Sequence, residues 1–358
     1  MHELAKVTRI QSVSPIEGKN RIELAKVENY DCVVSKGDFH PGDRCVYIFY
    51  DSILPERGEF EFLRKRCWSE KLKGFRIKPM RLGGIVSEGL VMPMSILPEG
   101  DYRDGQAVTD ILGIRLYEPP EEPVSYMTGK MPAREKLRRY LLKHRVTRKL
   151  AAHIPRIPTD FPSFIPKTDE ENIEALWSDL CSGNGPWYLT EKVEGQSATF
   201  VFRKQRLEVY SHTRRVFDGS WMKFACDNRL EAKMRSFCLK TGRKGLVIQG
   251  ELCGPGIQKN IYRFDSLRLF VFGMLELDGK RLDFHDMAAY CAAMGLETVP
   301  LLEEHAEISS DLAMILKNAE GQSVLAPVPR EGVVWRSEST PKHFKAKSRA
   351  YKVWFEEH

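Results

Sequence analysis

The chain has 358 residues, of which 42% are hydrophobic and 29% charged, and its formal net charge is +6. This length suits two domains of ordinary size, each with its own core, and the composition is that of a globular protein. The first ten residues, MHELAKVTRI, lack the apolar core of a signal peptide, and no run approaches 18 apolar residues. We therefore expect no membrane segment, and the charge is too small to identify an anionic partner by itself.

The cysteines exclude two further classes of protein. All eight are scattered along the chain, with no CxxC pair and no histidines at matching spacing, at positions 32, 45, 67, 181, 226, 238, 253 and 291. This pattern argues against a structural zinc site and against the disulfide framework of a secreted protein. We expect reduced thiols and a cytoplasmic or nuclear location.

Residues 1–118 are rich in short β-prone runs. Runs such as AKVTRIQSV, DRCVYIFY and GGIVSEGLVMP alternate with turn signals such as SPIEGKN and SKGDFHPGD. Several short strands at this spacing are typical of a small barrel, and the OB-fold is a good candidate. The proline-rich YEPPEEPVSY then predicts a linker at the end of this domain, and an OB-fold here would be expected to bind nucleic acid.

Residues 119–157 combine this linker with a basic segment. Between Lys130 and Lys149 there are nine Lys or Arg residues and one acid, Glu135, and a helix is predicted from about Pro132 to about Ala152. A solvated linker helix explains this charge as well as a helix that rests against phosphates. Arg138, Arg139, Lys143 and Arg145 are the residues that test the second interpretation.

Residues 158–358 show an α+β pattern. TDEENIEALWSDL predicts a helix with Thr168 and Asp169 as N-caps and one buried apolar stripe. Strands are predicted in PWYLTEKV, ATFVFR, LEVYS, GLVIQGEL and LRLFVFGML, and helices near 220–240, 284–294 and 310–320. This region is expected to be a second domain with its own chemistry.

The stretch YLTEKVEGQSATF raises the question of catalysis. It places Lys192 between Glu191 and Glu194 with a glycine directly after the second acid. An exposed strand end with mixed charges has the same appearance, so this tetrad alone is a weak signal. Four later segments strengthen it, because each puts a suitable side chain on or beside a predicted strand.

These later segments supply acids, an aromatic side chain and a lysine pair. Glu251 precedes two glycines that let the backbone turn close to a ligand, and Glu331 stands at the start of an apolar strand. Phe272 shares a strand face with Phe270, where an aromatic is more often core than a shelf for a base. Alternation also puts Lys345 and Lys347 on one face, which is either a solvated edge or an anion site.

Together these residues suit the attack of a lysine amine on the α-phosphate of a nucleoside triphosphate. The amine must be neutral to attack, whereas an ordinary lysine is protonated at pH 7. Lys345, Lys347 and a bound divalent metal would lower the pKa of Lys192, whereas Glu194 alone would raise it. Glu194 is therefore expected to hold the waters of hydrated Mg²⁺ rather than to contact the lysine.

In order, these segments resemble the motifs of the covalent nucleotidyltransferases, which comprise ATP-dependent DNA and RNA ligases and mRNA capping enzymes. The segments similar to these motifs are KVEG (192–195), SHTRR (211–215), GELCG (250–254), FVFG (270–273), EGVVWR (331–336) and KAK (345–347). The β-rich module comes first, and its PIEGKNRIELAKV and LPERGEFEFLRKR are similar to the amino-terminal OB module of Naegleria- and Deinococcus-type RNA ligases. The resemblance implies an OB-like β-barrel followed by an adenylyltransferase (ATP-grasp-like ligase) domain of antiparallel sheets with flanking helices.

The resemblance also implies a role for each matching residue. Lys192 would be adenylated, Phe272 would stack on adenine, and Glu191 would accept a hydrogen bond from the adenine amino group. The metal, Mg²⁺ or Mn²⁺, would be bound through water by Glu194, Glu251 and Glu331, and the α-phosphate would be contacted by Lys345 and Lys347. Arg214 is our choice for the nucleotide-contacting arginine, with Arg215 as the near alternative. Glu194 stands where the family usually has aspartate.

The implied activity is an ATP-dependent RNA ligase that joins 3′-OH and 5′-phosphate ends through a lysyl-AMP intermediate. Its expected partner is nucleic acid, a nicked duplex with RNA on the 3′-OH side, and we expect a monomer without membrane association. Two alternatives stay open: a capping-type nucleotidyltransferase that uses GTP, and a catalytically inactive OB-containing RNA-binding protein. Covalent labelling from ATP, from GTP or from neither separates the three.

Overall fold

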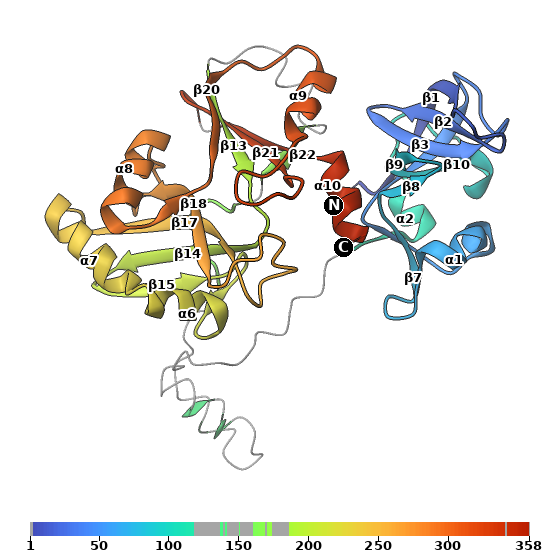
Figure 1. Cartoon of the computed structure of the whole chain (residues 1–358). Helices are drawn as coiled ribbons and strands as arrows, with labels where there is room; N and C mark the ends of the chain where they lie inside the picture. The colour runs from blue at the N-terminus through green and yellow to red at the C-terminus, as the bar shows by residue number, and fades with distance from the viewer. Residues whose placement is uncertain are drawn as a thin grey trace. The chain divides into compact units, whose positions relative to one another are not determined.

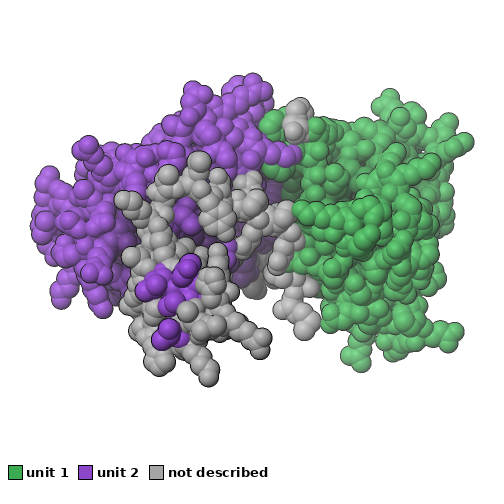
Figure 2. Space-filling model, turned by 90° about the horizontal axis from the view of Figure 1, so that it is seen from below, with its two compact units in different colours: residues 1–120, 352–358 green, residues 121–351 purple. Residues whose placement is uncertain are grey.

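The computed structural model describes residues 3–117, 137–138, 140–141, 150, 160–168, 170–173, 186–340 and 342–357 (Figure 1). It divides into two compact units, coloured in Figure 2: unit 1 holds residues 1–120 and 352–358, and unit 2 holds residues 121–351. The predicted basic helix at 132–152 lies almost wholly outside the described residues. No helix in the described part of the chain is long and apolar enough to cross a membrane.

Unit 1 is built from antiparallel strands. One sheet has the order β10-β4-β1-β2-β3, with β1 (Ala5–Pro15), β2 (Ile22–Val27), β3 (Tyr30–Ser35), β4 (Arg44–Phe49) and β10 (Gly89–Pro93). A second has the order β11-β5-β7-β6, with β5 (Ser52–Leu54), β6 (Trp68–Ser69), β7 (Gly74–Ile77) and β11 (Arg115–Leu116). The hairpin β8 (Met80–Leu82) and β9 (Ile85–Ser87) and the short helices η1 (Gly58–Leu63), α1 (Arg64–Cys67), η2 (Met94–Ile96) and α2 (Thr109–Leu112) complete it. This is the nearly closed OB barrel that the strand spacing predicts.

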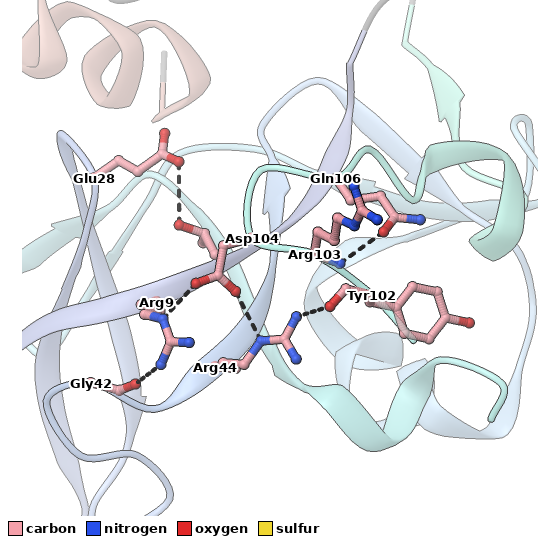
Figure 3. A network of polar contacts seen from close by, with 9 residues as sticks. Arg9, Glu28, Gly42, Arg44, Tyr102, Arg103, Asp104 and Gln106 are labelled. Carbon is pink, nitrogen blue, oxygen red and sulfur yellow. Dashed lines mark hydrogen bonds and ion pairs between the residues drawn. The ribbon is translucent and has the colours of Figure 1, made fainter. Parts of the chain in front are cut away.

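An apolar core fills the nearly closed barrel, and ion pairs stabilise its surface. Val7, Ile48 and Phe75, from three different strands, are fully buried in one cluster. The Asp104 carboxylate accepts hydrogen bonds from the Nε–H groups of Arg9 and Arg44, the latter at 2.9 Å (Figure 3). Because these arginines lie on or beside β1 and β4, the network attaches the loop that follows η2 to the five-stranded sheet.

Unit 2 contains two mainly antiparallel sheets. The first has the order β12-β22-β21-β13-β20, with β12 (Glu171–Asn172), β13 (Trp187–Lys192), β20 (Leu301–Ala306), β21 (Gly332–Ser337) and β22 (His343–Lys347). The second has the order β16-β15-β14-β17-β18-β19, with β14 (Gln196–Arg203), β15 (Arg206–Tyr210), β16 (Arg215–Val216), β17 (Gly245–Cys253), β18 (Arg268–Leu275) and β19 (Glu297–Thr298). The α+β class predicted for this region is confirmed.

The helices that cover these sheets are α6 (Gly219–Asp227), α7 (Leu230–Thr241), α8 (Phe284–Met294) and α9 (Leu312–Ala319). The boundary between the units lies within α10 (Arg349–Glu357). In Figure 1, α6, α7 and α8 lie along the six-stranded sheet, and Phe224, Met234 and Met287 pack from them onto it. Ile315 of α9 packs instead in the cluster of the five-stranded sheet with Trp335.

One helix begins later in the chain than the sequence predicts. The N-cap expected at Thr168 and Asp169 is not followed directly by helix, because Glu171 and Asn172 form β12, a parallel partner of β22, and the first helical residue is Ile173. This acidic stretch favours the start of a helix locally, but backbone pairing with a strand far away in the sequence outweighs that preference. Asp169 and the rest of the predicted helix, 174–180, lie outside the described residues.

Candidate active site

Lys192 stands at the point where the chain passes from one sheet of unit 2 to the other. It is the last residue of β13, pairs with Gly332 of β21, and is followed by only three residues before β14 begins. Its Nζ lies 2.6 Å from the Oε1 of Glu331. The lysine is therefore held by backbone pairing on one side and by an ion pair at its tip.

Gly195 is required by the packing that follows Lys192. A Cβ at this position would lie 2.5 Å from the carbonyl oxygen of Leu252 and 2.8 Å from the Sγ of Cys253. No other residue lets the start of β14 approach the end of β17 so closely. Glu194 is fixed by the same contacts, because its N–H donates to the Tyr262 hydroxyl at 2.8 Å and its carbonyl accepts from Cys253 at 3.2 Å.

Several carboxylates interact with Lys192 and with one another. Burial is the main cause that raises the pKa of Glu251 to about 8. The neighbouring carboxylates of Glu331, Glu170 and Glu194 raise that pKa further, while the ammonium of Lys192 opposes them. Glu251 thus carries a proton for much of the time at neutral pH, because burial and the nearby carboxylates disfavour its charged form.

The same carboxylates keep Lys192 protonated in the protein alone. Burial by itself lowers the pKa of Lys192, but the charges of Glu331 and Glu251 outweigh it, so the net shift is upward. The lowering of this pKa expected from Lys345, Lys347 and a bound divalent metal together stays a prediction. Glu331, rather than Glu194, is the residue in contact with Lys192.

A cleft opens beside Lys192 between the two sheets of unit 2. It is lined by Thr168, Glu170, Thr190, Glu191, Lys192, Val193, Ser197, His212, Glu251, Phe272, Val299, Val334, Arg336 and Lys345. Phe272 lies on this side of β18, with the guanidinium of Arg336 5.6 Å from its ring centroid, while Phe270 is buried. Of the two aromatics, the one predicted to face a nucleotide is the one that lines the cleft.

Glu191 lies at the back of the cleft with both carboxylate oxygens engaged. It is 1% exposed, and it accepts hydrogen bonds from the Ser323 hydroxyl and, at 2.8 Å, from the Val324 N–H. Each carboxylate oxygen has a second lone pair, so these bonds orient the group without using it up. Its predicted contact with an adenine amino group stays a prediction.

The two lysines of β22 share one side of the strand. Lys345 lines the cleft and pairs with Val334, and Lys347 pairs with Gly332, which pairs on its other side with Lys192. The strand alternation predicted from the sequence is thus present, with Ala346 fully buried between them. This arrangement points two ammonium groups toward the same region as the lysine of β13.

The arginines of SHTRR are not among the residues that line the cleft. Arg214 is exposed, and Arg215 in β16 is ion-paired with Glu208 at 3.2 Å. His212 of the same segment lines the cleft instead. The structure therefore does not bring our chosen arginine to the described cleft, and its role in nucleotide contact stays a prediction.

Two charged residues of the cleft wall, Arg336 and Glu170, were not predicted from the sequence. The Nη2 of Arg336 lies 2.8 Å from Glu170, and its Nη1 donates to the Thr190 hydroxyl at 3.2 Å. Alternation along β21 from Gly332 places Arg336 on the cleft side, which is a signal that could have identified it. Glu170 has no such signal, because it lies in the stretch predicted as helix.

The carboxylates near Lys192 fit a divalent metal that keeps its water ligands. In the parts of the chain that the structure describes, no group of three or more His, Cys, Asp or Glu side chains is placed to hold an ion directly. Glu251 interacts with the carboxylates of Glu331 and Glu194, and such a group of acids suits a hydrated cation that reaches them through water.

Two family models match parts of this chain. Residues 4–94 match a family model described as an OB-fold domain, and residues 185–354 match one described as RNA ligase. No curated protein sequence matches the chain. The match to an OB-fold model is consistent with the barrel of unit 1, and the RNA ligase model spans Lys192 and all the later segments.

Solved structures of a Naegleria gruberi RNA ligase are similar over the whole chain. The structure with pyrophosphate has a TM-score of 0.76 at 27% identity, covering 100% of this chain and 99% of that one. A lysine-to-methionine variant with AMP and Mn, and a glutamate-to-alanine variant with ATP and Mn, each have a TM-score of 0.76 at 26% identity with the same coverage.

Proposed function

Since the chain belongs to the ATP-dependent RNA ligases of the covalent nucleotidyltransferase superfamily, we propose that it seals nicks through a lysyl-AMP intermediate on Lys192. The observation that carries this proposal is the 2.6 Å contact between the Nζ of Lys192 and Glu331 at a cleft lined by Phe272 and Lys345. A solvated surface lysine would not lie half-buried against a carboxylate in this way.

In the first step the amine of Lys192 attacks the α-phosphorus of ATP. A P–N bond forms, the P–O bond to the β-phosphate breaks, and pyrophosphate leaves with that oxygen. Lys345 and Lys347 balance the charge that grows on the α-phosphate oxygens. Phe272 and Glu191 hold the adenine by stacking and by a hydrogen bond.

Lys192 must lose its proton and its ion pair with Glu331 before it can attack. Mg²⁺ or Mn²⁺, held through water by Glu194, Glu251 and Glu331, would supply the positive charge that lowers the pKa of the amine. In the second step AMP passes from Lys192 to the 5′-phosphate at the nick. The 3′-OH then attacks that activated phosphate, and AMP is released.

The function is tested with 5′-phosphate nicked duplexes that carry RNA or DNA on each strand in turn. We expect sealing with ATP wherever the 3′-OH strand is RNA, and label from α-labelled ATP on the denatured chain. Label from GTP alone would point to a capping-type enzyme. RNA binding without any label would point to an inactive RNA-binding protein.

The raised pKa of Glu251 predicts how metal affinity depends on pH. Below pH 8 a proton competes with the cation for this carboxylate, because its pKa is about 8. The apparent affinity for Mn²⁺ should rise up to about tenfold per pH unit below that value and level off above it. The measurement is the Mn²⁺ concentration that gives half-maximal labelling between pH 6.5 and 9. Glu251→Gln should flatten this dependence, and a flat profile in the unmodified protein would contradict it.

A further inference from the structure

A second pocket lies in unit 1, away from the β2–β3 side of the barrel that OB-folds commonly use for nucleic acid. It is built by the end of α1, by β6 and β7, and by Tyr117 after β11; α1 and β7 are labelled in Figure 1. Of its lining residues, the cationic ones are Arg66, Lys71, Arg76 and Lys78, and the aromatic ones are Trp68 and Tyr117. No aspartate or glutamate is among the described residues that line it.

The cations of this pocket fall into an inner and an outer pair. Arg76 and Lys78 form the inner pair, and both are ion-paired with Glu356 of α10, at 2.8 and 2.9 Å. Arg66 and Lys71 form the outer pair; both are exposed, and no ion pair joins either of them to another described residue. The inner pair is already ion-paired with a carboxylate of the chain itself, whereas the outer pair can bind an anionic group of a ligand.

The aromatic rings are held in place by cations. The guanidinium of Arg64 lies 4.4 Å from the ring centroid of Trp68, whose edge packs on Phe75 at 5.1 Å. The guanidinium of Arg76 lies 3.8 Å from the ring centroid of Tyr117. Both rings are half-buried and line the pocket, so part of the surface of each ring is accessible from the pocket. Fixed rings of this kind cost little entropy when a base stacks on them.

We propose that this pocket binds a single-stranded segment of nucleic acid, with Arg66 and Lys71 on phosphates and with Trp68 and Tyr117 as stacking surfaces for bases. The proposal rests on the proposed function, since the segment would be a single-stranded extension of the nicked duplex that the ligase seals. Clustered cations alone would suit any polyanion, but aromatic faces beside them favour unpaired bases, because duplex bases are already stacked.

The test uses the full chain and a 5′-fluorescein-labelled 12-residue oligouridylate, with binding followed by anisotropy over a range of salt. Arg66→Ala combined with Lys71→Ala should weaken binding about tenfold. It should also reduce the slope of log affinity against log salt by about 1.4, because each lost phosphate contact on a single strand accounts for about 0.7. The matched control, Lys240→Ala with Lys244→Ala, removes two exposed lysines of unit 2 and should change neither.

A second variant tests the stacking. Trp68→Leu keeps every charge, so it should weaken oligouridylate binding about fivefold or more without changing the salt slope. Equal losses for a blunt duplex of the same length would show phosphate contact alone and overturn the single-strand assignment. If Lys19→Ala with Lys36→Ala abolishes binding while the pocket variants do not, the β2–β3 side is the binding surface and the pocket assignment is wrong.

These outcomes are separable from failure of the proposed function. Labelling of Lys192 from ATP does not involve this pocket and should be unchanged in all the variants. Loss of labelling in the unmodified chain would refute the ligase mechanism. Unchanged oligouridylate affinity in the Arg66 and Lys71 variant, with labelling intact, would refute only the pocket.

Discussion

Lys192→Ala will abolish transfer of label from α-labelled ATP to the chain. The variant keeps β13, because the register of this strand with β21 is set by backbone pairing and not by the lysine side chain. What it loses is the amine whose Nζ lies 2.6 Å from Glu331, and alanine offers no nucleophile in its place. Label should fall to background in a denaturing gel, and nick sealing should stop with it.

The control for this loss is Lys240→Ala, which removes an exposed lysine of α7 outside the cleft. It should be labelled like the unmodified chain. A further test supplies a nick whose 5′ end is already adenylated, so that only the last step remains. Lys192→Ala should retain part of that activity. Persistent label on the Lys192 variant would mean that another lysine is the nucleophile.

Glu331→Gln will lower the labelling rate about a hundredfold, in spite of freeing Lys192. Two effects oppose each other. Loss of the carboxylate removes a cause of the raised pKa of Lys192, which favours the neutral amine. It also removes one of the acids that would hold the catalytic cation, and loss of such charge stabilisation typically costs about 10²–10³ in rate. We expect the second effect to dominate.

The pH profile separates these two effects. Because Glu331 raises the pKa of Lys192, the residual labelling of Glu331→Gln should reach half its maximum at a lower pH than that of the unmodified chain. Glu231→Gln, which alters an exposed ion pair on α7, serves as the control and should change neither rate nor profile. A Glu331→Gln variant that is faster at pH 7 would show that this acid only restrains the lysine.

Much of the fold was predictable because its signals are local. The strand of PWYLTEKV and the helix over 284–294 follow from β-prone residue types and from helical periodicity, and the structure has both of them. The exception is the acidic stretch around Glu171. Its pairing with β22 depends on a strand that comes much later in the chain, which no local pattern contains.

The site shows the same division. Lys192, Glu251 and Lys345 were predicted because each occupies a motif position in its own short segment, and all three line one cleft. Arg214 was selected on the same basis, but it is exposed and does not line that cleft. A short motif indicates which residues are present. The direction of each side chain depends on how the segment pairs within its sheet.

The sequence by itself determined the chemistry available to this protein: a lysine followed two residues later by an acid and then by glycine, with acids, aromatics and lysines in ligase order. The tertiary structure alone decided that Glu331 pairs with Lys192, that Gly195 must be glycine because β17 passes against it, and that Arg336 and Glu170 share the cleft. The reason is physical. Burial and charge act through space, so the pKa of Lys192 depends on groups that only the folded sheets bring beside it.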